Sequence, residues 1–414
     1  MAGKIFHMLL SFLMGLLMAR YLGPSNYGTL NYAAAYGTFF TAFCTLGINS
    51  VIIKDFVDHP EEEGLTIGTT ITLRLISSVL SFLTILGIVS VVDRSEPITI
   101  WVVALYSFSL IFQVFDTLQQ WFQAKLLSKY YAIATLISYT IATGYKAILL
   151  ITGKGVAWFA ISNSIDFLLA ALVLFIFYRK KNGPDFSFSM KKAKSLLAVS
   201  RSYILSGLMV AIYSATDKFM LKQMLDESNV GYYSLAVQIS TLWVFVLSAI
   251  IDSMKPPIME YHNTDKSLYL RMNRRMYAVV FYLSLGASLL ICLVAPLLVE
   301  IIYGSAYLPS VSPLRIVVWY VAFSYLGVAR DAWIVCERKQ KYLKYLYLGS
   351  AVLNVALNYL LIPIMGVNGA ALASLLTQMS TIFVFPMLFR ELRPNVKLIW
   401  DAIRLKDVFH KKTR

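Results

Sequence analysis

Charged residues are scarce in this chain of 414 residues, where Asp, Glu, Lys and Arg together make up 14%. Soluble proteins carry about a quarter charged residues, so this scarcity excludes a soluble globular protein. Cysteine and histidine are also rare, with 3 and 4 residues. Their spacing fits neither a disulfide framework nor a metal site. We therefore expect no disulfide, no bound metal and no other cofactor.

Hydrophobic residues are abundant instead, at 58% of the chain with a mean hydropathy of +0.67. Apolar runs of about 20 residues recur from end to end, each long enough to cross a hydrocarbon core of about 30 Å. The pattern predicts an all-α, polytopic membrane protein with about 12 transmembrane helices. The predicted spans are 5–22, 27–53, 65–92, 98–123, 130–152, 155–178, 202–225, 229–254, 276–304, 311–335, 345–365 and 367–389.

The distribution of basic residues tests this layout. If the amino terminus is cytoplasmic, the predicted cytosolic segments hold 28 of the 37 Lys and Arg residues and the outer loops hold 4. The positive-inside rule predicts such a bias for short loops, and an incorrect span count would scramble it. Both termini are therefore expected in the cytoplasm. The excess of basic residues in the cytosolic segments then explains the net charge of +15, and no nucleic-acid partner is expected.

Short motifs recur in the two halves of the chain. Ser25-Asn26-Tyr27-Gly28 reappears as Ser228-Asn229-Val230-Gly231, and Gly155-Val156-Ala157 is echoed by Gly369-Ala370-Ala371. Two pseudo-symmetric six-helix lobes around a cavity are a common transporter plan, with the substrate site at the repeat interface. The predicted domains are an N-terminal lobe 1–178, a cytoplasmic inter-lobe loop 179–201, a C-terminal lobe 202–389 and a basic cytoplasmic tail 390–414.

Five basic residues lie inside predicted spans, although a charge at bilayer depth costs several kcal/mol. They are Arg74, Lys146, Lys218, Arg315 and Arg330. Arg315 and Arg330 lie near span ends, so we expect them to anchor at the membrane interface. Lys218 either extends to the lipid headgroups or faces a water-filled lumen. For Lys146 it is equally open whether the side chain faces the lumen or not. If Arg74, Lys146 and Lys218 line one cavity, it attracts an anionic substrate.

Four blocks of sequence resemble one known family. They are "ARYLGPSNYGTLNYA" (19–33), "WFQAKLLSKYYAIA" (121–134), "TDKFMLKQMLDESNVGYYSLA" (216–236) and "LNVALNYLLIPIMGVNGAALAS" (353–374). In order and spacing the blocks are similar to the oligosaccharide flippases of bacterial polysaccharide synthesis. These exporters of O-antigen and capsule repeat units form a branch of the multidrug/oligosaccharidyl-lipid/polysaccharide superfamily.

The resemblance implies a flippase with alternating access that cleaves no bond of its substrate. The implied substrate is an undecaprenyl-pyrophosphate-linked oligosaccharide, moved across the bacterial cytoplasmic (inner) membrane for a surface polysaccharide such as lipopolysaccharide O-antigen or capsule. Arg74, Lys146 and Lys218 are the positions that match the family's cationic lumen. Asp217 then holds a partner cation or takes up a coupling proton. The expected partners are the lipid-linked substrate, membrane lipids, a coupling ion, and candidate polymerase and chain-length-regulator proteins.

Three other functions compete with this interpretation. A lipid II flippase carries the same anionic pyrophosphate, whereas the basic spans argue against a multidrug antiporter for cations. A membrane glycan polymerase is disfavoured because such enzymes have a large outer loop with catalytic residues. Every predicted outer loop here is short, and the polar segments contain no catalytic set of residues. We therefore expect a transporter and not an enzyme.

Overall fold

The computed structural model describes residues 2–406, with the side chains of 10–49, 51–201, 203, 204 and 207–406. Helices make up most of these residues and no strand occurs among them, which confirms the predicted all-α class. The chain forms two compact units, unit 1 (Met1–Phe219) and unit 2 (Met220–Arg414). The predicted lobe boundaries stay a prediction beside this division.

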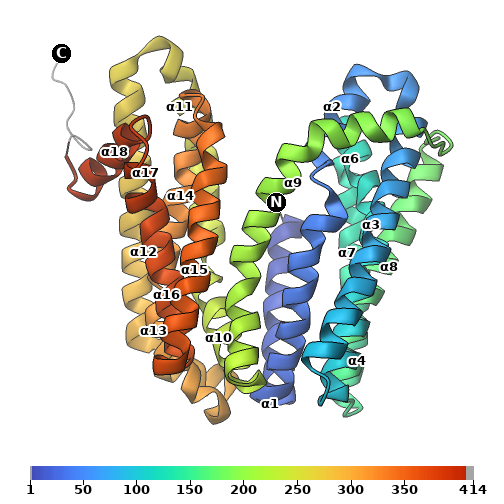
Figure 1. The fold of residues 1–414 in the computed structure, drawn as a ribbon, viewed down its shortest axis with the longest axis horizontal. Coiled ribbons are helices and arrows are strands. Elements are labelled where there is room, and N and C mark those ends of the chain that lie inside the picture. Colours follow the sequence, from blue (N-terminus) through green and yellow to red (C-terminus); the bar gives the residue numbers. More distant parts are fainter. Residues whose placement is uncertain (1, 407–414) are drawn as a thin grey trace. The chain divides into compact units, whose positions relative to one another are not determined.

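Unit 1 contains the helices from α1 to most of α9 (Figure 1). Their bounds are α1 (Ala2–Thr45), α2 (Asn49–Asp58), η1 (Pro60–Glu62), α3 (Glu63–Val92), α4 (Pro97–Ser107), α5 (Ser109–Phe112), η2 (Gln113–Asp116), α6 (Thr117–Ala124), α7 (Ser128–Ile151), α8 (Val156–Lys180) and α9 (Met190–Met224).

Unit 2 contains the remaining helices (Figure 1). They are α10 (Glu227–Thr241), α11 (Val244–Thr264), α12 (Lys266–Tyr303), η3 (Ser305–Ser310), α13 (Val311–Val317), α14 (Tyr320–Cys336), η4 (Gln340–Tyr342), α15 (Leu343–Met365), α16 (Val367–Met379), η5 (Ser380–Val384), α17 (Phe385–Met387) and α18 (Arg393–Ile403). The short η5 is a π-helix, in which each backbone N–H bonds one residue further back than in an α-helix.

Among the described residues, seven helical segments are long and apolar enough to cross a membrane, and the number rises to nine if each of two bent helix pairs is one span. The seven confirm the predicted spans 65–92, 98–123, 130–152, 155–178, 276–304, 345–365 and 367–389. The predicted spans 229–254 and 311–335 fall on the two bent pairs. The other three predictions fall on α1, α2 and α9. The total of about twelve spans and the cytoplasmic side of the termini therefore stay predictions. Part of the predicted basic tail, residues 407–414, lies outside the described residues.

A break at Gly23 divides α1 into two helical halves. Gly23 has φ +73°, a conformation that glycine adopts readily and other residues avoid. In a straight helix Met18 and Leu30 would lie about 18 Å apart. Both line one pocket, so the chain turns back at this break. The turn falls between the first two predicted spans, 5–22 and 27–53.

A second break interrupts the predicted span 27–53. Helix α1 ends at Thr45 and α2 begins at Asn49, with Leu46 and Gly47 both at positive φ between them. A Cβ atom on Gly47 would lie 2.7 Å from the backbone nitrogen of Ile204 in α9. The predicted span 27–53 is thus divided between α1 and α2, and hydropathy does not report this close backbone contact.

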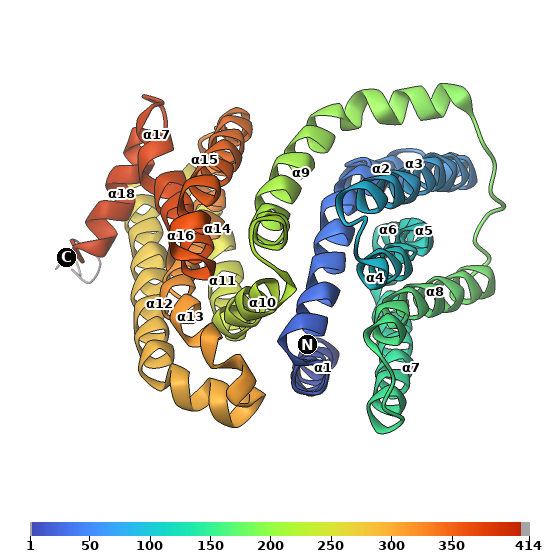
Figure 2. The same ribbon diagram turned by 60° about the horizontal axis from the view of Figure 1, so that its bottom comes forward.

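Residues 183–189, the strap, form an extended segment that joins α8 to α9 (Figure 2). The strap lies on α3: Ser187 N donates to the Gly64 carbonyl at 3.1 Å, and Ser189 N donates to Thr69 Oγ1 at 3.1 Å. Cβ atoms on Gly64 or Gly68 would overlap the strap backbone. The segment predicted as the inter-lobe loop, 179–201, thus consists of the end of α8, the strap and the first turns of α9.

An ion cluster fixes the start of α9. The Lys192 ammonium lies 2.8 Å from Asp55 of α2 and 2.7 Å from Glu62 of η1. Burial disfavours the charged lysine, but hydrogen bonds to the two carboxylates outweigh it and raise the pKa of Lys192. Both ends of the α8–α9 connection are therefore held against the same end of unit 1.

Candidate functional site

The candidate site is a pocket of about 190 Å³ in unit 1, lined by both polar and apolar side chains. Four helices, α1, α4, α7 and α8, contribute to its wall. We call it the Lys146 pocket. Its lining residues are Met18, Tyr27, Leu30, Asn31, Ala34, Tyr106, Lys146, Phe159, Ser162 and Asn163.

Helical spacing brings the lining residues to one place. On α1 they follow the pattern i, i+3, i+4 and i+7 after Tyr27, and on α8 the pattern i, i+3 and i+4 after Phe159. Asn31 Nδ2 donates to the Tyr27 carbonyl and Asn163 Nδ2 donates to Ser109 Oγ, each at 2.9 Å. These bonds orient both amides, whose oxygens are acceptors for a hydroxyl or an ammonium.

Lys146 brings a positive charge to this pocket from within α7, one of the helices long enough to cross a membrane. Its ammonium lies 5.8 Å from the centre of the Tyr139 ring. Asp166 of α8 is the acidic residue whose charge acts on it. A lysine among amide and phenol groups is able to attract an anion and to bind sugar hydroxyls.

Arg74 lies in a different part of unit 1. Its side chain is only 2% exposed. The guanidinium donates to Thr117 Oγ1 at 3.0 Å, to the Thr45 carbonyl at 3.5 Å and to Asn49 Oδ1. The charge of Asp116 acts on it from the neighbouring helix η2. Arg74 therefore joins the end of α1, the start of α2 and the start of α6.

Asp217 and Lys218 lie on α9, where it packs against α1. The next residue, Phe219, meets the rings of Tyr32 and Tyr36 edge-on, with centroids 5.7 and 4.8 Å away. Asp217 is buried and Lys218 is partly buried. Both residues belong to unit 1 by its contacts, although the sequence placed them in the C-terminal lobe.

The predicted cations occupy three separate surroundings in unit 1. Along α1, Asn31 of the Lys146 pocket and Thr45 of the Arg74 cluster are about 20 Å apart. The face of α1 with Asn31 lines the pocket, and a different face with Tyr32 and Tyr36 meets Phe219. A shared role as a cationic lumen stays a prediction.

The structure also corrects one sequence expectation and adds residues to the site. Arg330 was expected to anchor at the interface, but it is 3% exposed and donates to the Thr381 carbonyl of η5 at 3.0 Å. The neutral pocket residues Tyr27, Asn31 and Asn163 were not predicted. Their helical spacing within apolar spans was the available signal, but such spacing also occurs in ordinary helix packing.

Comparison with known proteins places the chain in a family. The family model described as "Polysaccharide biosynthesis protein" matches residues 17–312, which is most of the chain. The chain therefore belongs to this family, which confirms the resemblance in the sequence. A curated relative, the teichuronic acid biosynthesis protein TuaB of Bacillus subtilis (strain 168), is 23% identical over 203 residues. The match spans 48% of this chain and only 40% of that relative.

Solved transporter structures share the fold. The lipid II flippase MurJ in an inward closed conformation matches with a TM-score of 0.76 at 12% identity, over 98% of this chain and 90% of that one. An inward-facing multidrug resistance MATE family transporter of the MOP superfamily matches with a TM-score of 0.70 at 16% identity, over 95% and 96%. The protein is thus a multi-pass protein of the cell membrane, with a role in polysaccharide biosynthesis and the fold of MOP-superfamily transporters.

Proposed function

We propose that the protein is a flippase that moves undecaprenyl-pyrophosphate-linked oligosaccharides across the cytoplasmic membrane during surface polysaccharide synthesis. The observation that carries this proposal is the Lys146 pocket. It combines a cation from α7, a helix long enough to cross a membrane, with hydrogen-bonding groups that suit sugars. Membership of the polysaccharide biosynthesis family supports a saccharide as the cargo. The anionic pyrophosphate explains the need for basic residues where they are costly.

In this proposal Lys146, Lys218 and Arg74 supply positive charge along the substrate's path. Their separate surroundings suit an extended amphiphile whose pyrophosphate and sugars meet different groups as it moves. Asp217 balances the neighbouring lysine or takes up a coupling proton. The chemistry is binding and release, with no covalent step, so the protein acts as a transporter and not as an enzyme.

The cargo in this proposal is a repeat unit of a surface polymer such as O-antigen, capsule or teichuronic acid. The last of these is favoured by the name of the relative TuaB. A lipid II flippase is the second candidate, because MurJ shares the fold over 98% of this chain. Growth of a MurJ-depleted strain on this protein would favour lipid II, and rescue of a strain lacking its polysaccharide flippase alone would favour the repeat unit.

Substitution of Lys146 tests the role of the pocket in cells. K146A is expected to abolish surface polysaccharide in a strain that depends on this protein, while K146R restores at least part of it. The amount of protein in the membrane is measured beside the polymer, so that loss of transport is separated from loss of folding.

K218A is tested in the same way. R74A is the variant most prone to misfold, because Arg74 is buried and hydrogen-bonded. Normal polymer in all three alanine variants would refute the cationic path.

A further inference from the structure

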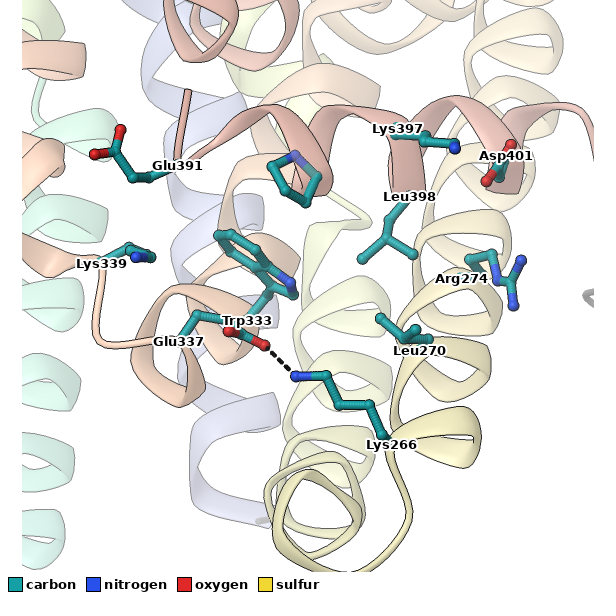
Figure 3. A pocket seen from close by; sticks show the side chains of 11 residues that line it. Lys266, Leu270, Arg274, Trp333, Glu337, Lys339, Glu391, Lys397, Leu398 and Asp401 are labelled. Atoms are coloured by element: carbon teal, nitrogen blue, oxygen red, sulfur yellow. Dashed lines mark hydrogen bonds and ion pairs between the residues drawn. The ribbon is translucent and has the colours of Figure 1, made fainter. Parts of the chain in front are cut away.

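Unit 2 contains a second pocket, of about 500 Å³, where the ends of α12 and α14 meet α18 (Figure 3). We call it the α18 pocket. Its lining residues are Lys266, Leu270, Arg274, Trp333, Glu337, Lys339, Glu391, Pro394, Lys397, Leu398 and Asp401. Its volume suits a small polar headgroup together with the first part of an apolar chain.

The lining has an apolar centre and a charged rim. Leu270, Trp333 and Leu398 lie in the middle of the view, and charged side chains from α12, α18 and the turn after α14 surround them (Figure 3). On α12 the lining residues recur at every fourth position after Lys266, so one face of that helix forms a continuous wall. The pocket is therefore amphiphilic, as a lipid headgroup site must be.

The charges of the rim favour an anion. Four basic and three acidic residues line the pocket. Glu337 is engaged already, because its Oε1 lies 3.2 Å from the Lys266 ammonium and 3.7 Å from the His262 ring. The lining as a whole keeps a net charge of +1, from four basic and three acidic side chains. The adjoining sequence adds further cations, including Arg271, Arg275, Arg338, Lys341 and Arg393.

The length of α12 indicates that the pocket lies outside the hydrocarbon core of the membrane. The 38 residues of α12 extend over about 57 Å, so its first turns, with Lys266 and Arg274, project beyond a hydrocarbon core of about 30 Å. Helix α18 buries Val396, Ile399 and Ala402 and exposes Trp400, a residue type that favours interfaces.

Two hydrogen bonds dock α18 against α12. Asn395 Nδ2 donates to the Tyr277 hydroxyl at 2.8 Å, and the Tyr282 hydroxyl donates to the Ile403 carbonyl at 2.6 Å. Both tyrosines lie beyond Arg274 along α12, in the direction of its apolar part. The wall that α18 gives to the pocket is therefore fixed by contacts outside the lining itself.

We propose that the α18 pocket binds the phosphate headgroup of an anionic membrane phospholipid. The phosphate lies among Arg274, Lys339 and Lys397, and the glycerol and upper acyl chain lie against Trp333, Leu270 and Leu398. Basic pockets between helix ends at the cytoplasmic interface are known to hold such headgroups. The site is distinct from the Lys146 pocket and does not depend on which saccharide is transported.

The test measures phosphatidylglycerol binding to the purified full-length protein in detergent, by titration in native mass spectrometry. The pocket variant K339Q/K397Q is compared with K344Q/K406Q, which removes the same charge from exposed lysines of unit 2 outside the pocket. We expect the pocket variant to bind about 30-fold more weakly, which is about 2 kcal/mol, and the control variant to bind like wild type. Equal weakening in both variants, or in neither, would overturn the proposal.

Two further binding measurements distinguish a lipid phosphate from free inorganic phosphate. Phosphatidylcholine, which is zwitterionic, is expected to bind no more tightly to wild type than to the pocket variant. Inorganic phosphate is expected not to compete with phosphatidylglycerol at equal concentration, because it lacks the apolar contacts. Competition by inorganic phosphate would assign the pocket to a free anion and overturn the lipid proposal. Both variants are first shown to unfold at the wild-type temperature without added lipid.

Discussion

Arg330 shows how the surroundings of one residue decide its role. Its position near the end of a predicted span favoured an interface anchor, yet its side chain is 3% exposed inside unit 2. One guanidinium nitrogen, Nη1, donates to the Thr381 carbonyl in the π-helix η5. A π-helical turn has unusual backbone geometry, and a long side chain with several donors is suited to satisfy its carbonyls.

At this scale we predict that R330M lowers the free energy of unfolding by about 1–3 kcal/mol, because the Thr381 carbonyl loses a buried partner. Thermal unfolding in detergent, followed by tryptophan fluorescence, measures the effect. R315M is the control, since Arg315 is exposed and a surface substitution changes stability by about 0.5 kcal/mol or less. If R330M and R315M unfold at the same temperature, Arg330 does not stabilise η5.

The basic residues also show how far sequence alone can reach at the residue scale. Arg74, Lys146 and Lys218 were found because a charge within an apolar run is visible without any structure. The residues that surround these cations were not predicted. Thr117 and Asn49, for example, lie far from Arg74 in the chain and contact it only after folding. Burial and partner identity are tertiary properties that hydropathy does not contain.

At the scale of elements, the strap depends on two glycines one helical turn apart. Gly64 and Gly68 of α3 leave room for the backbone of residues 183–189, which bonds to the Gly64 carbonyl. Glycine is unfavourable in a helix by about 1 kcal/mol relative to alanine. Here the close approach of the strap offsets that cost.

We predict that G68A displaces the strap, because the added Cβ would overlap the backbone of Ser187. The expected result is a lower unfolding temperature and faster cleavage within 183–189 by a protease. G87A is a matched control on the same helix, where a Cβ would meet nothing within 4 Å. That substitution is expected to leave cleavage unchanged and to stabilise slightly. Identical cleavage of both variants would mean that the strap does not depend on close packing at Gly68.

Breaks within helices mark the limit of prediction at this scale. Seven of the spans found in the described part of the chain were predicted from hydropathy alone, because a membrane requires long apolar runs whatever their packing. The interruption at Gly47 was missed, since it arises from contact with α9, more than 150 residues further along the chain. The repeated Ser-Asn motifs fall at comparable places, after the break at Gly23 in α1 and at the start of α10.

For the whole molecule, the family match connects the chain with polysaccharide biosynthesis, and the fold is that of MOP-superfamily transporters. The bias of 28 basic residues to one side and 4 to the other predicts the orientation of the chain in the membrane. The recurring apolar runs were sufficient to predict the helical class, and the resemblance of four sequence blocks was sufficient to predict the family. The individual cargo was not predictable in the same way, because it depends on a few contacts and not on the periodicity of the helices.

The most direct measurement is the rate at which the purified protein in proteoliposomes moves a fluorescent undecaprenyl-pyrophosphate-linked oligosaccharide between leaflets. An uncharged lipid with the same oligosaccharide is the comparison. The proposed function predicts that wild type accelerates the movement of the charged lipid only. K146A is expected to lower that rate at least about tenfold, which corresponds to a loss of roughly 1.4 kcal/mol of interaction free energy. K146R is expected to recover part of the rate. Equal rates for both lipids, or a K146A variant as fast as wild type, would contradict a cationic path for an anionic carrier.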